Sequence, residues 1–426
     1  MKKYIIVLAA LLCASTAFAQ EEKPAHFKLY GFIRNYVTAD TREVNAGTND
    51  LFFYMPKDKN MQGGVDLNAG FNWRYLSLTT RLGLDVSGYK FGRMNLSGKV
   101  EADFYSLSGT TSAAIIPQLR LRQAFVKLSW DDSPLALTLG QAWHPMGADL
   151  PHITNLESGA PFNPFNRSPQ VTLDYKAGDF TFTASLLYLN HFLPTGPNGK
   201  SAEYYKYGLP ELYVGAAYKS GKFLTKLGLD MVNMKPYRTV VDAGYIVKAH
   251  GLLSTFSPFL FVQYTDGLFQ LRAKTIFSQA GEHMNLLSGY GIASYDAATH
   301  TYTYAPMQDW ASFVSFQYGK KTQLMCTLGY FKQMGTTKDI MQTANATTGA
   351  MEYALWMNTA ADTKIQQAFR ATPTIAWNIG KFTVSLEYNL TAAQFGRGDR
   401  NIRGMYDGDP EWILNHRFIC MTKFNF

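Results

Sequence analysis

The sequence predicts an all-β fold: a transmembrane antiparallel β-barrel of sixteen strands with an inward-folded third extracellular loop. Three observations support this prediction. The chain is rich in aromatic residues (15%) and poor in charged ones (17%), which is unusual for a soluble protein. Long runs alternate between apolar and polar residues, as expected of membrane strands. Short turns interleave with long polar connections, which is the asymmetry of outer-membrane barrels.

Residues 1–19 are expected to be an export signal. Lys2 and Lys3 precede an apolar stretch, and Ala17-Phe18-Ala19 is a small-x-small cleavage site. The apolar stretch is shorter than the roughly 20 residues that a membrane-spanning helix needs. Loss of the two lysines lowers the formal charge from +8 to +6. Residues 20–426 are then predicted to form a single outer-membrane β-barrel domain.

Two runs show the strand pattern most clearly. The run LSLTTRLGLDV (residues 76–86) places leucines and valine on one face and Arg81 and Asp85 on the other. The run FTVSLEYNL (residues 382–390) alternates in the same way. Such lengths suit a tilted membrane strand of about 9–11 residues, whereas strands of soluble sandwiches usually have about 5–6.

The turns and connections predict the strand count. Short turns are expected at 88–90, 131–134, 176–179, 219–222, 265–267, 319–321 and 378–381. Long connections lie near 42–70, 105–117, 143–168, 190–209, 235–250, 280–308, 335–364 and 393–411. They separate strands near 27–40, 73–87, 94–104, 119–130, 135–142, 170–176, 180–189, 210–219, 223–234, 252–264, 268–279, 311–318, 322–333, 366–378, 382–392 and 413–426. An even count places both ends on the periplasmic side, and a barrel of this size leaves an aqueous channel.

The last strand carries a further signal. It ends Thr422-Lys423-Phe424-Asn425-Phe426, with alternating aromatic residues and a terminal Phe. This ending resembles the assembly signal of bacterial outer-membrane proteins. Together with the export signal, it predicts location in the bacterial outer membrane.

The third long connection, between Leu135 and Tyr175, is the candidate functional segment. It is longer than the roughly 12–15 residues at which loops without secondary structure become uncommon. It contains Trp143, Phe162 and Phe165, whereas disordered segments are poor in aromatics. Its prolines, at positions 145, 151, 161, 164 and 169, stiffen the chain. We expect it to fold into the lumen and restrict passage.

Charged and aromatic residues of this loop and of the polar strand faces are the candidate pore-lining and constriction residues. They are Arg34, Arg81, Arg120, Arg122, Trp143, His144, Asp149, His152, Glu157, Arg167, Arg272 and Arg370. For each of these residues there is an alternative to a role in the pore: the side chain solvates the inner wall or pairs with a neighbouring strand. His144, Asp149 and His152 offer metal-ligand chemistry, but their spacing is not diagnostic, so we expect no metal and no cofactor.

The fourth strand, LRLRQAFVKLSW, breaks the alternation. If Arg120 and Arg122 face inward, Gln123 and Lys127 face outward, which costs about 2–4 kcal/mol for a lysine at the bilayer midplane. A bulge could change the phase, or another subunit could shield this face. The second explanation is favoured here because both arginines then point at the third loop.

Enzymatic and nucleic-acid functions are not indicated. The chain has no G-x-S-x-G or H-E-x-x-H motif, and its Lys and Arg residues are scattered rather than clustered. Cys326 and Cys420 lie within apolar runs, which favours small buried or lipid-facing residues over a disulfide. We therefore expect neither an enzyme nor a nucleic-acid-binding protein.

Several segments resemble the DcaP-like trimeric porins, in particular a Bacteroidetes-type branch. They are LRLRQAFVKLSW, LTLGQAWHP, FNRSPQVTLDY, KLYGFIRNYVTADTRE, TRLGLDVSG and GLFQLRAKTIF. The resemblance implies a trimer of sixteen-stranded barrels whose loop constricts a channel for small, often anionic, solutes. Arg120, Arg122 and Arg167 would form the basic side of the constriction. The chain departs from some members of that family, since it has no heptad segment between Gln20 and His26.

The predicted function is therefore a passive outer-membrane porin for small hydrophilic solutes, with a preference for anionic or carboxylated ones. The charge of +6 and the arginines near the third loop motivate this preference. Its partners would be small solutes, outer-membrane lipid and two further copies in a homotrimer. A saccharide-specific porin is the alternative, because Trp143, Phe162, Phe165, Tyr30 and Tyr36 could stack on sugars. A structural or adhesive barrel with a plugged lumen is the third possibility.

Overall fold

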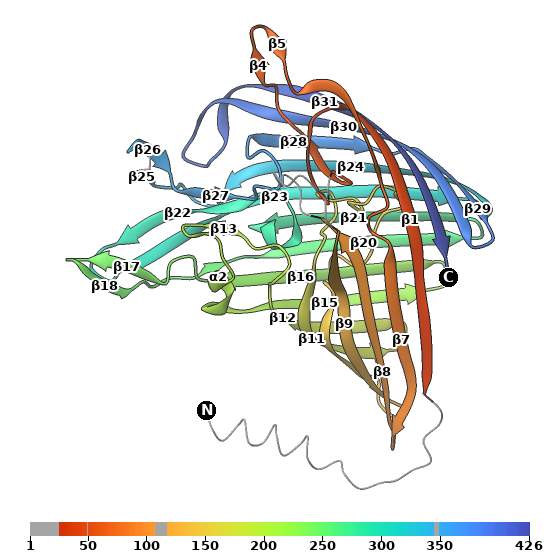
Figure 1. Ribbon diagram of the computed structural model, residues 1–426. Helices are drawn as coiled ribbons and strands as arrows, with labels where there is room; N and C mark the ends of the chain where they lie inside the picture. Colours follow the sequence, from red (N-terminus) through yellow and green to blue (C-terminus); the bar gives the residue numbers. More distant parts are fainter. Residues whose placement is uncertain (1–24, 49, 107–116, 345–348) are drawn as a thin grey trace.

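The wall of the molecule is one antiparallel sheet that closes on itself into a barrel (Figure 1). The computed structural model describes residues 25–48, 50–106, 117–344 and 349–426. The predicted export signal lies outside these residues. The sheet closes where β1 (His26–Arg42) pairs with β31 (Tyr406–Asn425), in a register that joins Arg34 to Lys423 and Asp40 to Arg417. The predicted barrel of sixteen strands is confirmed.

The remaining strands of the wall follow in chain order. Three of the sixteen are each divided into two consecutive labelled pieces. The remaining strands are β6 and β7 (Ala69–Leu76, Arg81–Phe91), β8 (Met94–Tyr105), β9 (Gln118–Trp130), β10 (Leu135–Trp143), β11 (Arg167–Ala177), β12 (Phe180–Leu187), β15 (Leu209–Ser220), β16 (Phe223–Met234), β19 and β20 (Leu253–Ser254, Ser257–Asp266), β21 (Phe269–Gln279), β23 (Thr301–Tyr318), β24 (Thr322–Thr336), β28 and β29 (Ile365–Ala371, Thr374–Ile379) and β30 (Phe382–Arg400). Each pairs with its neighbours around the barrel.

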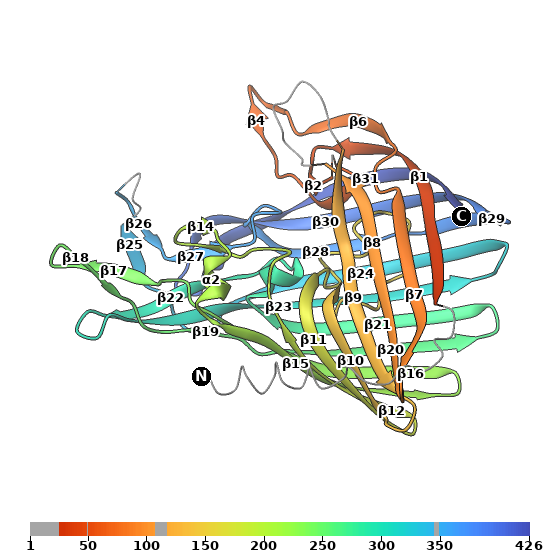
Figure 2. The ribbon, with the colours of Figure 1, turned by 60° about the horizontal axis from the view of Figure 1, so that its bottom comes forward.

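The long connections carry small elements of their own. They are β2 and β3 (Val44–Gly47, Phe52–Pro56), β4 and β5 (Met61–Gln62, Val65–Asp66), β13 and β14 (Thr195–Gly196, Gly199–Lys200), α2 (Glu203–Lys206), β17 and β18 (Thr239–Asp242, Tyr245–Lys248), η1 (Gly281–Met284), β22 (Gly289–Asp296), β25 and β26 (Gln342–Ala344, Met351–Tyr353) and β27 (Leu355–Met357). Figure 2 shows the β17–β18 and β25–β26 hairpins at the left, and the short turn after β29 at the right. Long loops and short turns therefore occupy opposite ends.

The first short turn lies later in the chain than predicted. The prediction placed it at 88–90, but β7 continues to Phe91 and the turn is formed by Gly92 and Arg93. Gly88 instead has a positive φ of 93°, at a register shift between Val86 and Tyr89. A glycine in the left-handed region therefore marks a β-bulge here and not a turn.

Three strands extend further toward the long-loop end than the alternation predicted. β23 begins at Thr301, β30 continues to Arg400, and β31 begins at Tyr406. These extensions pair with each other or with β22. Alternation between an apolar and a polar face marks only the part of a strand with lipid on one side, so the sequence pattern did not reveal them.

The outer face of the wall is apolar and the inner face is largely polar. On β1, Phe27, Leu29 and Ile33 are exposed, whereas Thr38 and Asp40 on the opposite face are buried. An apolar outer surface of this kind is typical of a barrel in a bilayer. Cys326 and Cys420 are free thiols on β24 and β31, with no disulfide between them.

Among the described residues, no helix is both long enough and apolar enough to cross a bilayer.

The fourth wall strand, β9, contains a bulge that resolves its irregular pattern. Glu101 pairs with Gln123 and Ala102 with Leu121, which leaves Arg122 as an extra residue. The bulge shifts the phase, so Arg122 and Gln123 are both buried, and Val126 rather than Lys127 faces outward. The preferred explanation, shielding of an outward Lys127 by another subunit, was wrong because the extra residue turns that lysine inward.

Candidate functional site

The third long loop, residues 144–166, is held against the inner face of the barrel by side chains of the wall. Lys274 on β21 donates hydrogen bonds to the carbonyl oxygens of Met146 and Asp149 and to Oδ1 of Asn163, at 2.7, 2.9 and 2.7 Å. Lys226 on β16 pairs with the Asp149 carboxylate at 2.8 Å. These contacts connect the first half of the loop to one side of the barrel.

The second half of the loop contacts strands further round. The backbone N–H of Thr154 donates to Oε2 of Glu387 on β30 at 2.5 Å. Tyr36 on β1 donates its hydroxyl proton to the carbonyl oxygen of Thr154 at 2.9 Å. Arg370 on β28 pairs with Glu157 at 3.1 Å, and both side chains are buried. The loop therefore contacts wall strands from β16 round to β1.

Where the loop leaves β10, His144 joins a buried charged cluster. Its Nε2 lies 2.6 Å from Oε1 of Glu211 on β15 and 3.5 Å from Oδ1 of Asp230 on β16. His283, from η1, lies 3.3 Å from Oδ2 of Asp230 and 3.7 Å from Oε1 of Glu211. All four side chains are buried. The cluster thus connects two different loops to the wall.

This cluster has the donor types of a metal site, but one hydrogen bond opposes metal binding by His144. The backbone N–H of Met146 donates to His144 Nδ1 at 3.2 Å, so that nitrogen acts as an acceptor and Nε2 carries the ring proton. A metal-ligating histidine usually has the opposite arrangement, with the second nitrogen donating. The cluster is therefore a hydrogen-bonded network of two histidines and two carboxylates as it stands. The other trio considered, His144, Asp149 and His152, is not brought together, since each has different partners.

His152 gives the loop a dependence on pH. Burial, with the nearby Arg272 guanidinium as a second cause, lowers the pKa of His152 from 6.5 to about 4. The unfolded chain binds a proton below pH 6.5 that the folded chain does not bind until about pH 4. We expect the free energy of unfolding to fall as pH decreases through this window.

The measurement is urea unfolding of the detergent-solubilised barrel between pH 4 and 7. In a His152→Gln variant, this part of the slope should be lost because the titrating group is gone. An unchanged slope in the variant would show that His152 is not responsible.

Two further long loops, the one that contains Tyr54 and the one that contains Met284, meet the third loop inside the barrel. The sequence analysis did not predict this contact. The backbone N–H of Phe165 donates to the carbonyl oxygen of Met284 at 2.9 Å. Tyr54, Phe162 and Leu286 belong to one buried apolar cluster, which also includes wall side chains of β20, β23, β24 and β30. A signal was present: the apolar stretches at 51–55 and 284–287 lie inside otherwise polar connections.

A row of basic side chains lies on the wall strands β31, β1, β7 and β9. Arg34 donates to Thr79 Oγ1 at 3.1 Å through Nε and at 2.8 Å through Nη2. Lys423 is its register partner on β31. Arg81 lies 3.6 Å from Glu101. Arg34 and Lys423 thus have no carboxylate partner among the described residues.

Two arginines of β9 continue the row, and they differ in exposure. Arg120 pairs with Asp103 at 2.8 Å and keeps 27% of its side chain exposed. Arg122 pairs with both Glu101 and Asp103, at 2.8 and 2.7 Å, and is only 5% exposed. Arg120 is therefore partly open to solvent, whereas Arg122 neutralises the acids of the wall.

Arg167, at the start of β11, is a buried cation without an acidic partner in the described parts of the chain. Its guanidinium lies 4.8 Å from the centre of the Trp143 ring and 5.1 Å from that of Phe165. Its Nη2 lies 3.5 Å from Nε2 of His191, and its Nη1 has no hydrogen-bond partner among the described residues. With 2% exposure, Arg167 adds positive charge to this side of the barrel without contacting bulk water.

The remaining candidate residues hold the third loop in place. Arg272 donates to the carbonyl oxygen of Leu150 at 2.7 Å. Arg370 donates to the carbonyl oxygens of Ala160 and Tyr54 at 2.9 and 2.6 Å. These two arginines therefore bind loop backbone, and the row on β1, β7, β9 and β31 is left as the partly exposed basic surface.

Comparison with known proteins gives the fold. No family model and no curated protein match the sequence. The outer-membrane channel DcaP of Acinetobacter baumannii is similar in structure, with a TM-score of 0.64, 17% identity, and coverage of 96% of this chain and 99% of that chain. An OmpT variant of Vibrio cholerae lacking loop L8 matches at a TM-score of 0.52 and 14% identity, over 95% of this chain and 100% of its own.

The anion-selective porin from Comamonas acidovorans also matches, at a TM-score of 0.51 and 9% identity, over 95% of this chain and 100% of its own. The fold is thus that of these solved outer-membrane proteins over nearly the whole chain. Identities this low establish the fold alone.

Proposed function

We propose that this protein is an outer-membrane porin, a passive channel for small hydrophilic solutes that prefers anionic or carboxylated ones. The observation that carries the proposal is the charge on one side of the lumen. Six basic side chains gather there, Arg34, Arg81, Arg120, Arg122, Arg167 and Lys423, against the two carboxylates Glu101 and Asp103. A surplus of positive charge in a low-dielectric passage attracts anions.

The rest of the proposal follows from the fold. The apolar outer face suits a bacterial outer membrane, and residues 1–19 would direct export and be removed, leaving 20–426 as one barrel domain. DcaP is an outer-membrane channel, and one neighbour in fold is an anion-selective porin. An OmpT of Vibrio cholerae is described as a trimer, and we propose a homotrimer here. In this proposal the chain is not an enzyme and needs no cofactor.

A salt gradient across a planar bilayer tests the proposal. The purified protein should conduct, and its reversal potential should have the sign of anion selectivity. A reversal potential of the opposite sign would refute the anion preference. Block of the current by a dicarboxylate, but not by an oligosaccharide, would support a preference for carboxylated solutes.

The saccharide-specific alternative is less favoured by the geometry. Tyr36, Phe162 and Phe165 are buried, and the guanidinium of Arg167 lies over the Trp143 ring. Faces that are already covered do not stack on sugars. A barrel with a plugged lumen is the second candidate, favoured by the apolar cluster in which three loops meet. Absence of any conductance from a folded sample would select it.

A further inference from the structure

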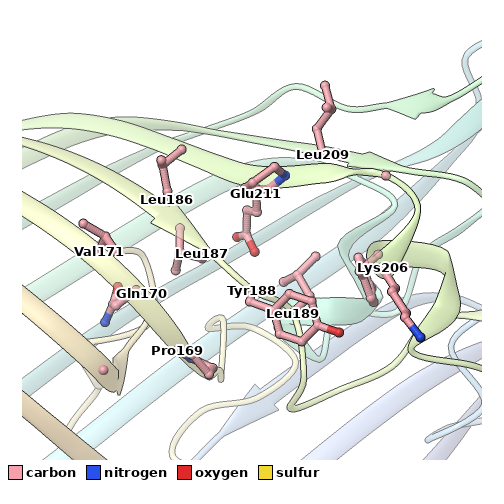
Figure 3. Close-up of a pocket in the computed structure, with 14 residues that line it drawn as sticks. Pro169, Gln170, Val171, Leu186, Leu187, Tyr188, Leu189, Lys206, Leu209 and Glu211 are labelled. Carbon is pink, nitrogen blue, oxygen red and sulfur yellow. The ribbon is translucent and has the colours of Figure 1, made fainter. Parts of the chain in front are cut away.

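An apolar groove of about 520 Å³ lies on the outer face of the barrel, near the long-loop end (Figure 3). It lies between β11, β12 and β15, where β12 ends at Leu187 and the chain leaves the wall. Val171, Leu186 and Leu209 are exposed along it. Gly140 and Gly208 are also among the residues that line it. The volume of the groove and its mainly apolar lining suit a hydrocarbon chain.

The shape of the groove has a local cause. The pairing of β12 with β15 ends at Leu187 and Glu211, and the pairing of β15 with β16 shifts register between Leu209 and Leu212. Pro169 and Pro210, which line the groove, have no backbone N–H to continue a ladder. The strand pairing is therefore irregular here, and the groove lies at this irregularity.

Two basic side chains lie at or next to the groove: Lys206 lines it, and Arg238 contacts Tyr207, the residue after Lys206. Lys206, the last residue of α2, lines the groove, and in Figure 3 its amine extends away from the apolar side chains. Its Nζ lies 5.7 Å from the centre of the Tyr207 ring. Arg238 lies 4.5 Å from the same ring, and its Nη1 donates to the Tyr207 hydroxyl at 3.0 Å. Both cations therefore flank one exposed tyrosine.

The two cations are available for an anionic ligand. Neither Lys206 nor Arg238 forms an ion pair with any residue that the structure describes, and both are exposed. Two acids are near Lys206, Glu203 three residues earlier in α2 and the buried Glu211, which also lines the groove, but neither forms an ion pair with it. Guanidinium and ammonium groups bind phosphate, and tyrosine favours the boundary between hydrocarbon and water. An apolar slot with two cations and a tyrosine beside it matches a lipid with a phosphate headgroup.

We propose that this groove binds one lipid of the surrounding bilayer, with an acyl chain between Val171, Leu186 and Leu209 and its anionic phosphate headgroup at Lys206 and Arg238. The inference rests on the membrane location in the proposed function, but not on conduction. The groove faces outward, so its occupant comes from the bilayer and not from the lumen.

A tryptophan in the groove reports occupancy. Tyr188, which lines the groove, is replaced by Trp, and quenching is measured with brominated-acyl phosphatidylglycerol and phosphatidylcholine in detergent. Background from the native tryptophans is subtracted with the unmodified protein. We expect quenching by the anionic lipid at about tenfold lower concentration, given two basic residues at the headgroup.

Two double variants distinguish binding of the lipid at this groove from a general electrostatic attraction of anionic lipid to the basic protein. Lys206→Gln with Arg238→Gln should abolish the preference for the anionic lipid. Lys176→Gln with Lys219→Gln removes the same charge near the short turns at the opposite end of the barrel and should preserve it. Equal preference in the first variant and the parent, or equal loss in both variants, overturns the proposal.

A second measurement uses the native groove. Native mass spectrometry of the unmodified protein, equilibrated with both lipids, should retain one phosphatidylglycerol per chain, and the Lys206→Gln/Arg238→Gln variant should not. Retention without selectivity overturns the proposal. Failure of the protein to conduct would refute the porin function and leave this result unaffected.

Discussion

Replacing Asp40 by alanine is expected to lower the free energy of unfolding by about 3–5 kcal/mol, the usual cost of removing one partner from a buried ion pair. Asp40 and Arg417 are register partners on β1 and β31, where the barrel closes. Both side chains are 0% exposed, and the guanidinium donates two hydrogen bonds to the carboxylate, each of 2.8 Å. Without the carboxylate, a charged guanidinium stays buried in the seam.

The surroundings of the pair make relaxation difficult. Arg417 also donates to the carbonyl oxygen of Asp50 at 2.8 Å and lies 4.6 Å from the centre of the Phe53 ring. Asn415 donates to Oδ1 of Asp40 at 2.8 Å. The arginine is thus held between the wall and the first long loop, and it cannot reach water without moving that loop.

Urea unfolding in detergent, followed by tryptophan fluorescence, measures the effect. Asp85→Ala is the matched control, because Asp85 and Lys99 are 39% and 30% exposed and such pairs contribute at most about 1 kcal/mol. Equal losses in the two variants would contradict the interpretation. The double variant Asp40→Leu/Arg417→Met should recover much of the loss, since it leaves no unpaired charge.

Removing Arg34 and Lys423 together should reduce the ratio of anion to cation permeability by about threefold in dilute salt, as expected for two charges about 10 Å from a permeating ion. These two residues are chosen because neither has a carboxylate partner among the described residues, so Arg34→Gln/Lys423→Gln changes charge without leaving a buried acid unpaired. Arg120→Gln would be less clean, since Asp103 would lose a partner.

The measurement is the reversal potential in a salt gradient. Lys320→Gln/Lys321→Gln removes the same charge from an exposed short turn and should leave the ratio unchanged. The effect of the first variant should shrink at about 1 M salt, where the Debye length is near 3 Å. A ratio unaffected by loss of Arg34 and Lys423 would show that this row does not face the ion path.

The wall of the barrel could be predicted because its cause is local. Lipid on one side and a polar interior on the other impose a two-residue period that can be counted, as on residues 76–86 and 382–390. The turns are equally local. The prediction failed where a single residue changed the phase: at Gly88, and at Arg122, where a bulge turned Lys127 inward and removed the need for a shielding subunit.

The interior could not be predicted in the same way. The alternating pattern and the turn residues were enough to predict the barrel class, the number of wall strands, and the third loop with its charged residues as the segment of interest. The three-dimensional arrangement was needed to show that Arg122 and Arg167 are buried while Arg120 is partly exposed. It was also needed to show that His144 joins Glu211, Asp230 and His283. Those partners lie on strands and loops distant in the chain. Burying a charge is costly unless a partner neutralises it or forms a hydrogen bond to it. Closure of the barrel brings such partners together from distant parts of the chain, so the local sequence pattern does not reveal them.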